Sequence, residues 1–255
     1  MLCLIIPNGN FAHAENLPKL AIVIDDFGQD RHGITEMLNI NAPLTCAIMP
    51  KMEFSVTDAF EAHRHGHEVI LHMPMEANVR LPKSWYGKLM ISTSDSTEHA
   101  AQLFEEALES IPFAVGANIH IGSGVSENKR LMTKILEIVK DKNMFFLDSL
   151  TSEKTVCKNV AEDIGAKVVT RDEFLEKTGS PSYDYAKKKL YSAYEKSRVN
   201  GYAIVIGHVG PEGGKSTAKA ISDFIAENKN VKIVPLSEIV SDVYNTWKIE
   251  INILV

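Results

Sequence analysis

The chain has 255 residues, of which 45% are hydrophobic and 24% charged, and a formal net charge of −6. This length suits one large α/β domain or two small ones, and such a chain can bury a substantial core. The acidic balance gives no electrostatic reason to expect nucleic acid or an anionic membrane surface as a partner. No segment reaches the roughly 20 apolar residues that an integral membrane span requires.

The first residues differ from the rest of the chain. A short apolar run and turn residues lead to Ala12-His13-Ala14, which has the small-residue pattern of a signal cleavage site. The basic region that should precede the apolar run is missing. We therefore expect residues 1–14 to be an export signal without its beginning, and the alternative is a disordered apolar tail. Export implies a secreted, periplasmic or cell-envelope location.

The stretch Leu20–Gly28 contains the first predicted strand. Five apolar residues lead to the adjacent Asp25 and Asp26, as in a strand buried on both faces of a parallel sheet. Acids do not belong inside such a sheet, so we expect them at its C-terminal end, where ligands bind in α/β folds. Neighbouring carboxylates repel each other, and a bound cation relieves this repulsion. The alternative is a helix-capping aspartate beside a solvated one.

Apolar, strand-like runs alternate with amphipathic segments along the chain. The predicted strands are Leu20–Ile24, Leu44–Met49, Glu68–Leu71, Ala114–Ile119, Met144–Leu147, Ala166–Val169, Tyr202–Ile206 and Val231–Pro235. The predicted helices are Arg31–Leu38, Ser55–His65, Ser96–Ser110, Glu127–Lys142, Val156–Ile164, Tyr183–Asn200 and Lys215–Asn228. Such regular alternation favours parallel strands with right-handed crossovers.

Seven to eight strand–helix units predict a distorted or incomplete (β/α) barrel. A doubly wound open sheet is the second candidate, but the chain has no G-x-G-x-x-G after the first strand and no P-loop. Without repeats or linkers, residues 15–244 should form a single domain. The tail 245–255 fits an added strand or a docked apolar end. Cys46 and Cys157 stand alone, and we expect buried thiols rather than a disulfide.

Histidine or aspartate follows five of the predicted strands. Besides Asp25-Asp26, these residues are His72, His120, Asp148 and His208. A single histidine at such a place is more often a packed core or rim residue. A barrel, however, brings all the strand ends around one mouth. The five ends together therefore indicate a site.

Imidazole and carboxylate are ligands for zinc and similar divalent metals. A catalytic metal of this kind takes three protein ligands, lowers the pKa of its water to about 7 and polarises a carbonyl. This ligand set predicts hydrolysis of an amide or an ester. The chain has no G-x-S-x-G and no H-E-x-x-H motif, which disfavours a serine hydrolase or a zincin.

Seven short motifs follow one another along the chain, namely AIVIDDFG, GHEVILHMPME, VGANIHIGS, FFLDSLTS, RDEFLE, AIVIGH and VPLSEIV. In this order they resemble the divergent polysaccharide deacetylase family, over about Leu20 to Tyr244. The resemblance implies a distorted (β/α) barrel of the polysaccharide deacetylase type with a metal at its mouth. It also implies a polysaccharide or glycan substrate. Trp85 and Tyr86, in the long loop Ala77–Ser94, suit either stacking on a sugar ring or anchoring a packed loop.

The resemblance implies a metal site built from Asp26, His72 and His120. Asp26 corresponds to the metal-binding aspartate of the wider superfamily, and the two histidines are the other expected ligands. The metal should be divalent, and zinc is the first choice.

The resemblance also implies three catalytic roles. Asp25 corresponds to the catalytic base, and His208 would protonate the leaving amine. Asp148 would orient a histidine or contribute to the metal shell, which is a supporting role.

Three features differ from the usual family pattern. Asn118-Ile119 stands where paired asparagines usually occur, and Leu150 stands where an arginine is common. The chain also lacks, at the expected place, the H-x-x-x-H motif that supplies both metal histidines in well-characterised deacetylases. The metal ligands must therefore come from separate strands.

These observations lead to an exported, metal-dependent hydrolase that removes N- or O-acetyl groups from a polysaccharide. The three differences favour an alternative, a carbohydrate-binding or scaffold protein that keeps the barrel but has lost catalysis. A third candidate is a hydrolase of a non-carbohydrate amide. The sequence leaves the oligomeric state open.

Overall fold

The structure, a computed structural model, describes residues 17–177 and 180–253, with the backbone alone for 246–253. The expected export signal at 1–14 lies outside the described residues. Within them, no helix combines the length and apolar character needed to cross a membrane.

Parallel strands form one curved sheet in the described residues. They are β1 (Lys19–Phe27), β2 (Thr45–Ile48), β3 (Glu68–Met75), β4 (Ala114–Ile121), β5 (Phe145–Asp148), β6 (Val168–Thr170), β7 (Glu173–Phe174), β8 (Tyr202–His208) and β9 (Lys232–Val234). The strand order is β6-β5-β4-β3-β2-β1-β8-β7, and β9 pairs with the start of β1. With β6 and β7 at its two edges, the sheet is a distorted, incompletely closed (β/α) barrel, which confirms the predicted fold class.

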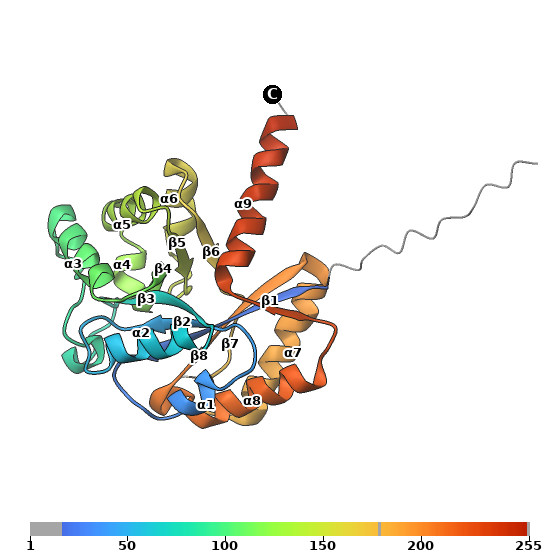
Figure 1. Cartoon of the computed structure of the whole chain (residues 1–255). Helices are drawn as coiled ribbons and strands as arrows, with labels where there is room; N and C mark the ends of the chain where they lie inside the picture. The colour runs from blue at the N-terminus through green and yellow to red at the C-terminus, as the bar shows by residue number, and fades with distance from the viewer. Residues whose placement is uncertain (1–16, 178–179, 254–255) are drawn as a thin grey trace, which may run out of the picture.

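The strands alternate with helices, and the helices before α9 cover the outside of the sheet. The helices are α1 (Ile34–Leu38), α2 (Ser55–Arg64), α3 (Thr97–Glu109), α4 (Ser123–Ser126), α5 (Lys129–Asp141), α6 (Cys157–Ile164), α7 (Tyr183–Asn200), α8 (Gly214–Glu227) and α9 (Leu236–Ile253), with short 3-10 turns η1 (Lys83–Tyr86) and η2 (Gly210–Glu212). Figure 1 shows α3, α5 and α6 gathered on the side of β3–β5, and α1, α7 and α8 gathered near β8.

The sheet separates two apolar cores, because successive side chains of a strand point to opposite faces. In β1, for example, Ile22 packs outward among the helices, whereas Val23 packs inside the curl of the sheet. The inside is completed by Leu236 and Ile239 of α9, which are both fully buried. Burying side chains of this size contributes about 1.5–3 kcal/mol each. The start of α9 therefore closes the inside of the barrel at one end, while the rest of this helix extends away from the sheet (Figure 1).

Polar contacts hold α9 against the sheet, both at its first two residues and at Tyr244. At its start, the backbone N–H of Ser237 donates to the Glu68 carboxylate (3.2 Å), and that of Leu236 donates to the Thr45 hydroxyl (3.0 Å). Further along, the Tyr244 hydroxyl accepts from the backbone N–H of Val168 (2.7 Å) in the edge strand β6.

Several details differ from the sequence-based predictions. Residues 245–253 continue α9 and are not an added strand, and β7 was not predicted. His72 lies inside β3, which runs on to Met75, and not after its end. Cys46 and Cys157 are buried free thiols, as expected.

Candidate active site

Strand alternation directs most of the predicted site residues into the curl. Val23, Ile70 and Ile206 belong to the inner core, so the residues two positions later face the same side. These residues are Asp25, His72 and His208. On β4, Asn118 and His120 alternate with Ala117 and Ile119, which belong to the outer core. One end of the barrel interior therefore collects these polar side chains from β1, β3, β4 and β8.

Asp26 joins this group by a local departure from strand geometry. Simple alternation would point it outward, opposite to Asp25. Its backbone instead has φ 70°, in the left-handed region, and the pairing of β1 with β2 shifts register between Ile24 and Phe27. Holding a non-glycine residue there costs about 1–3 kcal/mol. The turn brings the Asp26 carboxylate to His72 and His120.

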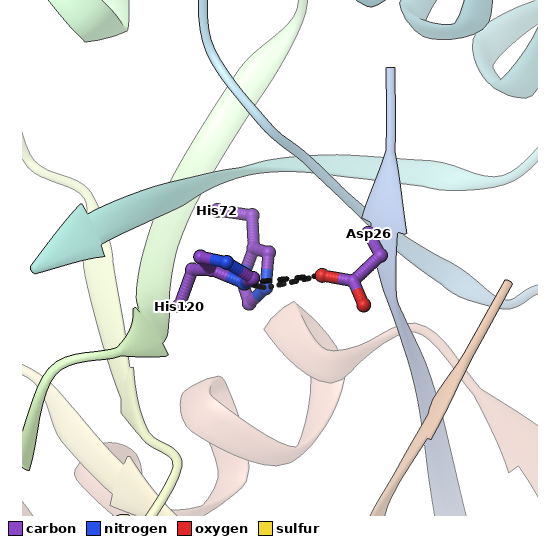
Figure 2. Close-up of side chains that lie close together, drawn as sticks. All are labelled: Asp26, His72 and His120. Atoms are coloured by element: carbon purple, nitrogen blue, oxygen red, sulfur yellow. Dashed lines mark hydrogen bonds and ion pairs between the residues drawn. The ribbon is translucent and has the colours of Figure 1, made fainter. Parts of the chain in front are cut away.

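Asp26, His72 and His120 each contribute one potential metal-ligating atom to a nearly equilateral triangle. Figure 2 shows both imidazole rings pointing at the Asp26 carboxylate. Asp26 Oδ1 lies 3.2 Å from His72 Nε2 and 3.1 Å from His120 Nδ1, and the two nitrogens are 3.1 Å apart. Tetrahedral coordination with bonds of about 2.0–2.1 Å separates neighbouring ligand atoms by about 3.3–3.4 Å. The spacing is therefore close to that of three ligands on one small cation.

Hydrogen bonds on the far side of each ring fix where its proton lies. Asp25 can only accept, so the amide nitrogen of Asn118 donates to Asp25 Oδ1 (2.8 Å). The amide oxygen of Asn118 then accepts from His72 Nδ1 (2.7 Å). The backbone carbonyl of Trp85 likewise accepts from His120 Nε2 (2.8 Å). In the tautomer with the proton on the outer nitrogen, each ring turns its other nitrogen toward Asp26, as ring orientation by an outer partner achieves in metal sites.

The triangle needs a positive charge at its centre. Asp26 Oδ1 is buried and accepts no hydrogen bond, so electron pairs of one oxygen and two nitrogens converge without a proton between them. Burial would raise the pKa of Asp26, but the contacts with His120 and His72 hold it well below its usual range. Burial would lower the pKa of His72, but the charges of Asp25 and Asp26 raise it. A proton or a metal cation satisfies this demand, and the donor set fits a divalent metal.

Asp25 is suited to be a base. Its side chain is almost fully buried, and this burial raises its pKa despite the opposing charges of His72 and His208. Its second oxygen, Oδ2, lies 3.8 Å from His72 Nε2. In the sheet, Asp25 and His208 are direct neighbours on β1 and β8.

His208 has a carboxylate partner that the sequence analysis did not identify. Glu176 Oε2 lies 2.9 Å from His208 Nδ1, and Glu176 Oε1 accepts from the His208 backbone N–H (3.2 Å) and from the Thr217 hydroxyl. Burial would lower the pKa of His208, but the hydrogen bond with Glu176 and the charges of Asp26 and Asp25 raise it to about 10. The histidine is therefore cationic at neutral pH and can donate a proton.

Asp148 lies on the opposite face of its strand. Phe145 and Leu147 of β5 face the inner core, so alternation sends Asp148 the other way. Its carboxylate accepts from the Leu150 backbone N–H (3.0 Å) and the Thr155 hydroxyl (2.9 Å). In the described part of the chain no hydrogen bond joins it to a histidine. It organises the turn after β5, while Asn118 and Glu176 contact the histidines.

The two aromatic residues of the long loop have different surroundings. Tyr86 is buried, and its hydroxyl accepts from the Ala77 backbone N–H (3.1 Å), so it anchors the loop. The Trp85 side chain is 55% exposed, although its carbonyl holds His120. Trp85 is therefore the one of the two that is open to a ligand.

Comparison with known proteins gives a family match over most of the chain. A model of the family described as divergent polysaccharide deacetylase matches residues 22–240. The uncharacterized protein YibQ of Escherichia coli K12 is 33% identical over 193 residues, which are 76% of this chain and 59% of YibQ. An uncharacterized protein of Haemophilus influenzae is 31% identical over 205 residues, 79% of this chain and 70% of that one. The chain thus spans less than two thirds of the length of YibQ.

Solved structures share the fold at low sequence identity. The uncharacterized protein ATU2773 of Agrobacterium tumefaciens has a TM-score of 0.79 at 20% identity, covering 88% of this chain and 89% of its own. A Mycobacterium smegmatis protein assigned to the polysaccharide deacetylases has a TM-score of 0.59 at 16% identity, covering 91% and 92%.

Proposed function

Because the chain belongs to the divergent polysaccharide deacetylase family, we propose that it is an exported, metal-dependent hydrolase that removes N- or O-acetyl groups from a polysaccharide. The observation that carries the proposal is the triangle of Asp26 Oδ1, His72 Nε2 and His120 Nδ1, in which the aspartate oxygen is buried and accepts no hydrogen bond. Export rests on the sequence pattern of residues 1–14 alone.

Asp26, His72 and His120 would hold the metal, for which we propose zinc. When bound, such a metal polarises the acetyl carbonyl and lowers the pKa of water. Asn118 keeps His72 in the tautomer that can bind, and the carbonyl of Trp85 does the same for His120. Three protein ligands leave room for the substrate.

Asp25 and His208 would divide the proton transfers. Asp25 takes a proton from the attacking water, and its raised pKa makes it a stronger base than a solvated carboxylate. His208 donates a proton to the leaving amine or alcohol, while Glu176 keeps its ring oriented and charged. The proposed base and acid are direct neighbours on β1 and β8.

A carbohydrate-binding protein without turnover is the second candidate. The differences from the family pattern at Ile119 and Leu150 favour it, whereas the residues suited to act as a base, an acid and metal ligands support the hydrolase.

Metal analysis and acetate release test the proposal together. We expect about one divalent ion per purified chain, and loss of this ion in His72→Ala and in His120→Ala. Asp25→Asn should retain the ion but release acetate from acetylated chitin, xylan or peptidoglycan fragments about 10²–10⁴-fold more slowly. The exposed His65, replaced by alanine, is the control and should change neither measurement.

The outcomes separate the candidates. Full metal content in the His72 and His120 variants would rule out the proposed ligand set. A wild-type protein that holds the ion but releases no acetate from any of the glycans would support the binding protein.

A further inference from the structure

A cavity of about 840 Å³ lies in the loop between β3 and α3. Its volume is typical of sites for small ligands. The walls are partly apolar, with Leu81, Pro82, Tyr86 and Leu89 among the lining residues. The cavity belongs to Ala77–Ser94, the loop that the sequence analysis marked as long and aperiodic.

Three cations line this cavity. Arg80, Lys83 and Lys88 are exposed, and no ion pair, hydrogen bond or ring contact of their side chains is found among the described residues. The only acid in the lining is Glu76, whose carboxylate is occupied by Thr93 (2.7 Å) and by Ser92 (2.8 Å). Because three cations face one carboxylate, the cavity lining is a local excess of positive charge in a chain with a net charge of −6.

The same loop reaches the candidate active site. Trp85, whose carbonyl accepts from His120 Nε2, stands between Lys83 and Tyr86, both of which line the cavity. A ligand that fills the cavity therefore touches the segment that contacts a proposed metal ligand.

We propose that Arg80, Lys83 and Lys88 bind an anionic substituent on a sugar near the acetylated one, so that the substrate is an acidic polysaccharide. The inference rests on the proposed function and narrows its substrate class. Carboxylate, phosphate and sulfate share the required chemistry, since a guanidinium pairs with their oxygens bidentately and lysines add point charges. A concave site suits a sugar substituent better than a flat anionic bilayer.

Binding can be measured without turnover, at the loop itself. Trp85 and Trp247 are the two tryptophans of the chain, so a Trp247→Phe protein reports on Trp85 alone. The first probe is oligogalacturonate, compared with its methyl ester, which has the same backbone without charge. Dextran sulfate and dextran phosphate, each compared with plain dextran, separate the three anions. In titrations followed by Trp85 fluorescence, we expect the Kd of at least one anionic probe to be about tenfold lower than the Kd of its neutral match.

A matched pair of triple variants tests the residues. Arg80→Gln/Lys83→Gln/Lys88→Gln should weaken anionic binding about tenfold or more. Arg64→Gln/Lys142→Gln/Lys188→Gln removes the same charge from exposed residues elsewhere and should weaken it less than about twofold. Equal losses in the two triple variants, or equal affinity for charged and neutral probes, would overturn the inference.

Two further outcomes keep this inference separate from the proposed function. In the first, vesicles with anionic lipid bind the wild type but not the Arg80→Gln/Lys83→Gln/Lys88→Gln variant, and no charged glycan binds. This result would overturn the inference in favour of a membrane contact. Charge-dependent glycan binding in a protein that never releases acetate would support the anion site and contradict only the deacetylase.

Discussion

Glu176 controls the charge of His208, and through it the proposed acid. The carboxylate is 7% exposed and meets the ring nitrogen at 2.9 Å. Because a buried negative charge favours the imidazolium, the pKa of His208 is raised to about 10. The acid should thus remain protonated throughout the neutral range.

Replacing Glu176 by glutamine should shift the pH profile of deacetylation. The reaction needs protonated His208, so the rate falls as the pH rises through the pKa of this residue. Without the carboxylate that pKa drops, and the alkaline limb should move down by about 1–3 pH units. The measurement is kcat/KM against pH for Glu176→Gln and wild type.

Glu173→Gln is the control for this shift. Glu173 lies on the same segment but pairs with Lys189 and Lys196 instead. An unchanged alkaline limb in Glu176→Gln, or an equal shift in both variants, would show that Glu176 does not set the charge of His208.

At the residue scale, the sequence correctly predicted those site residues whose side chains point to the inner face of the sheet by regular strand alternation. Asp25, His72 and His208 each lie two positions after an inner core residue, and His120 follows the outer core residue Ile119, so all four share the inner face. Asp148 directly follows the inner core residue Leu147, so it faces the opposite side of the sheet. Glu176 was missed because it follows a two-residue strand with no readable pattern. The pair Asn118-Ile119 was read as a departure from the family because of Ile119, and the contacts by which Asn118 joins Asp25 to His72 were not predicted.

At the scale of elements, the hydroxyl of Tyr244 ties α9 to the edge strand β6. It accepts from the Val168 backbone N–H (2.7 Å) and donates to the carbonyl of Ala166 (3.0 Å). Tyr244→Phe leaves that N–H without a partner, which should lower the free energy of unfolding by about 1–3 kcal/mol. Denaturant unfolding measures the loss, and hydrogen exchange at Val168 should accelerate.

Tyr191→Phe serves as the comparison. Its hydroxyl donates to Glu227 at the surface (2.8 Å), where such contacts contribute only about 0–1 kcal/mol. Equal destabilisation of the two variants would mean that Tyr244 is not a special anchor of α9.

Element prediction succeeded where the period was clear. The amphipathic helices and the long apolar strands were found, with their ends displaced by a few residues at most sites. Helix α9 was missed although Leu236, Ile239, Val240, Val243 and Tyr244 have helical spacing. Only the start of this segment was interpreted, through the predicted strand Val231–Pro235 and the motif VPLSEIV.

At the scale of the whole molecule, the candidate metal centre connects distant parts of the chain. Its ligands come from β1, β3 and β4, which are separated by tens of residues. A metal that binds only the folded protein adds about 2.7 kcal/mol when supplied at 100 times its Kd. For a chain of this size, the melting temperature should rise by about 5–10 °C.

Thermal unfolding with and without added zinc checks this expectation. His65→Ala should show the full rise, and Asp26→Asn, which removes the ligand charge but keeps the side-chain shape, should show almost none. A rise of the same size in Asp26→Asn would place the bound metal elsewhere.

The architecture as a whole was predictable because strand–helix alternation leaves few topologies for one parallel sheet. The gap between β6 and β7 was not, since sheet closure depends on long-range pairing that no local pattern encodes. The packing of the start of α9 inside one end of the barrel was also not predictable, for the same reason.

The left-handed backbone of Asp26 has an evolutionary consequence. Glycine adopts φ 70° without strain and carries no buried charge, so a chain selected for stability alone would favour glycine here. Aspartate stands here instead, at a cost in stability, and its carboxylate completes the triangle. A lineage that no longer used the proposed metal site would therefore be expected to replace this aspartate early.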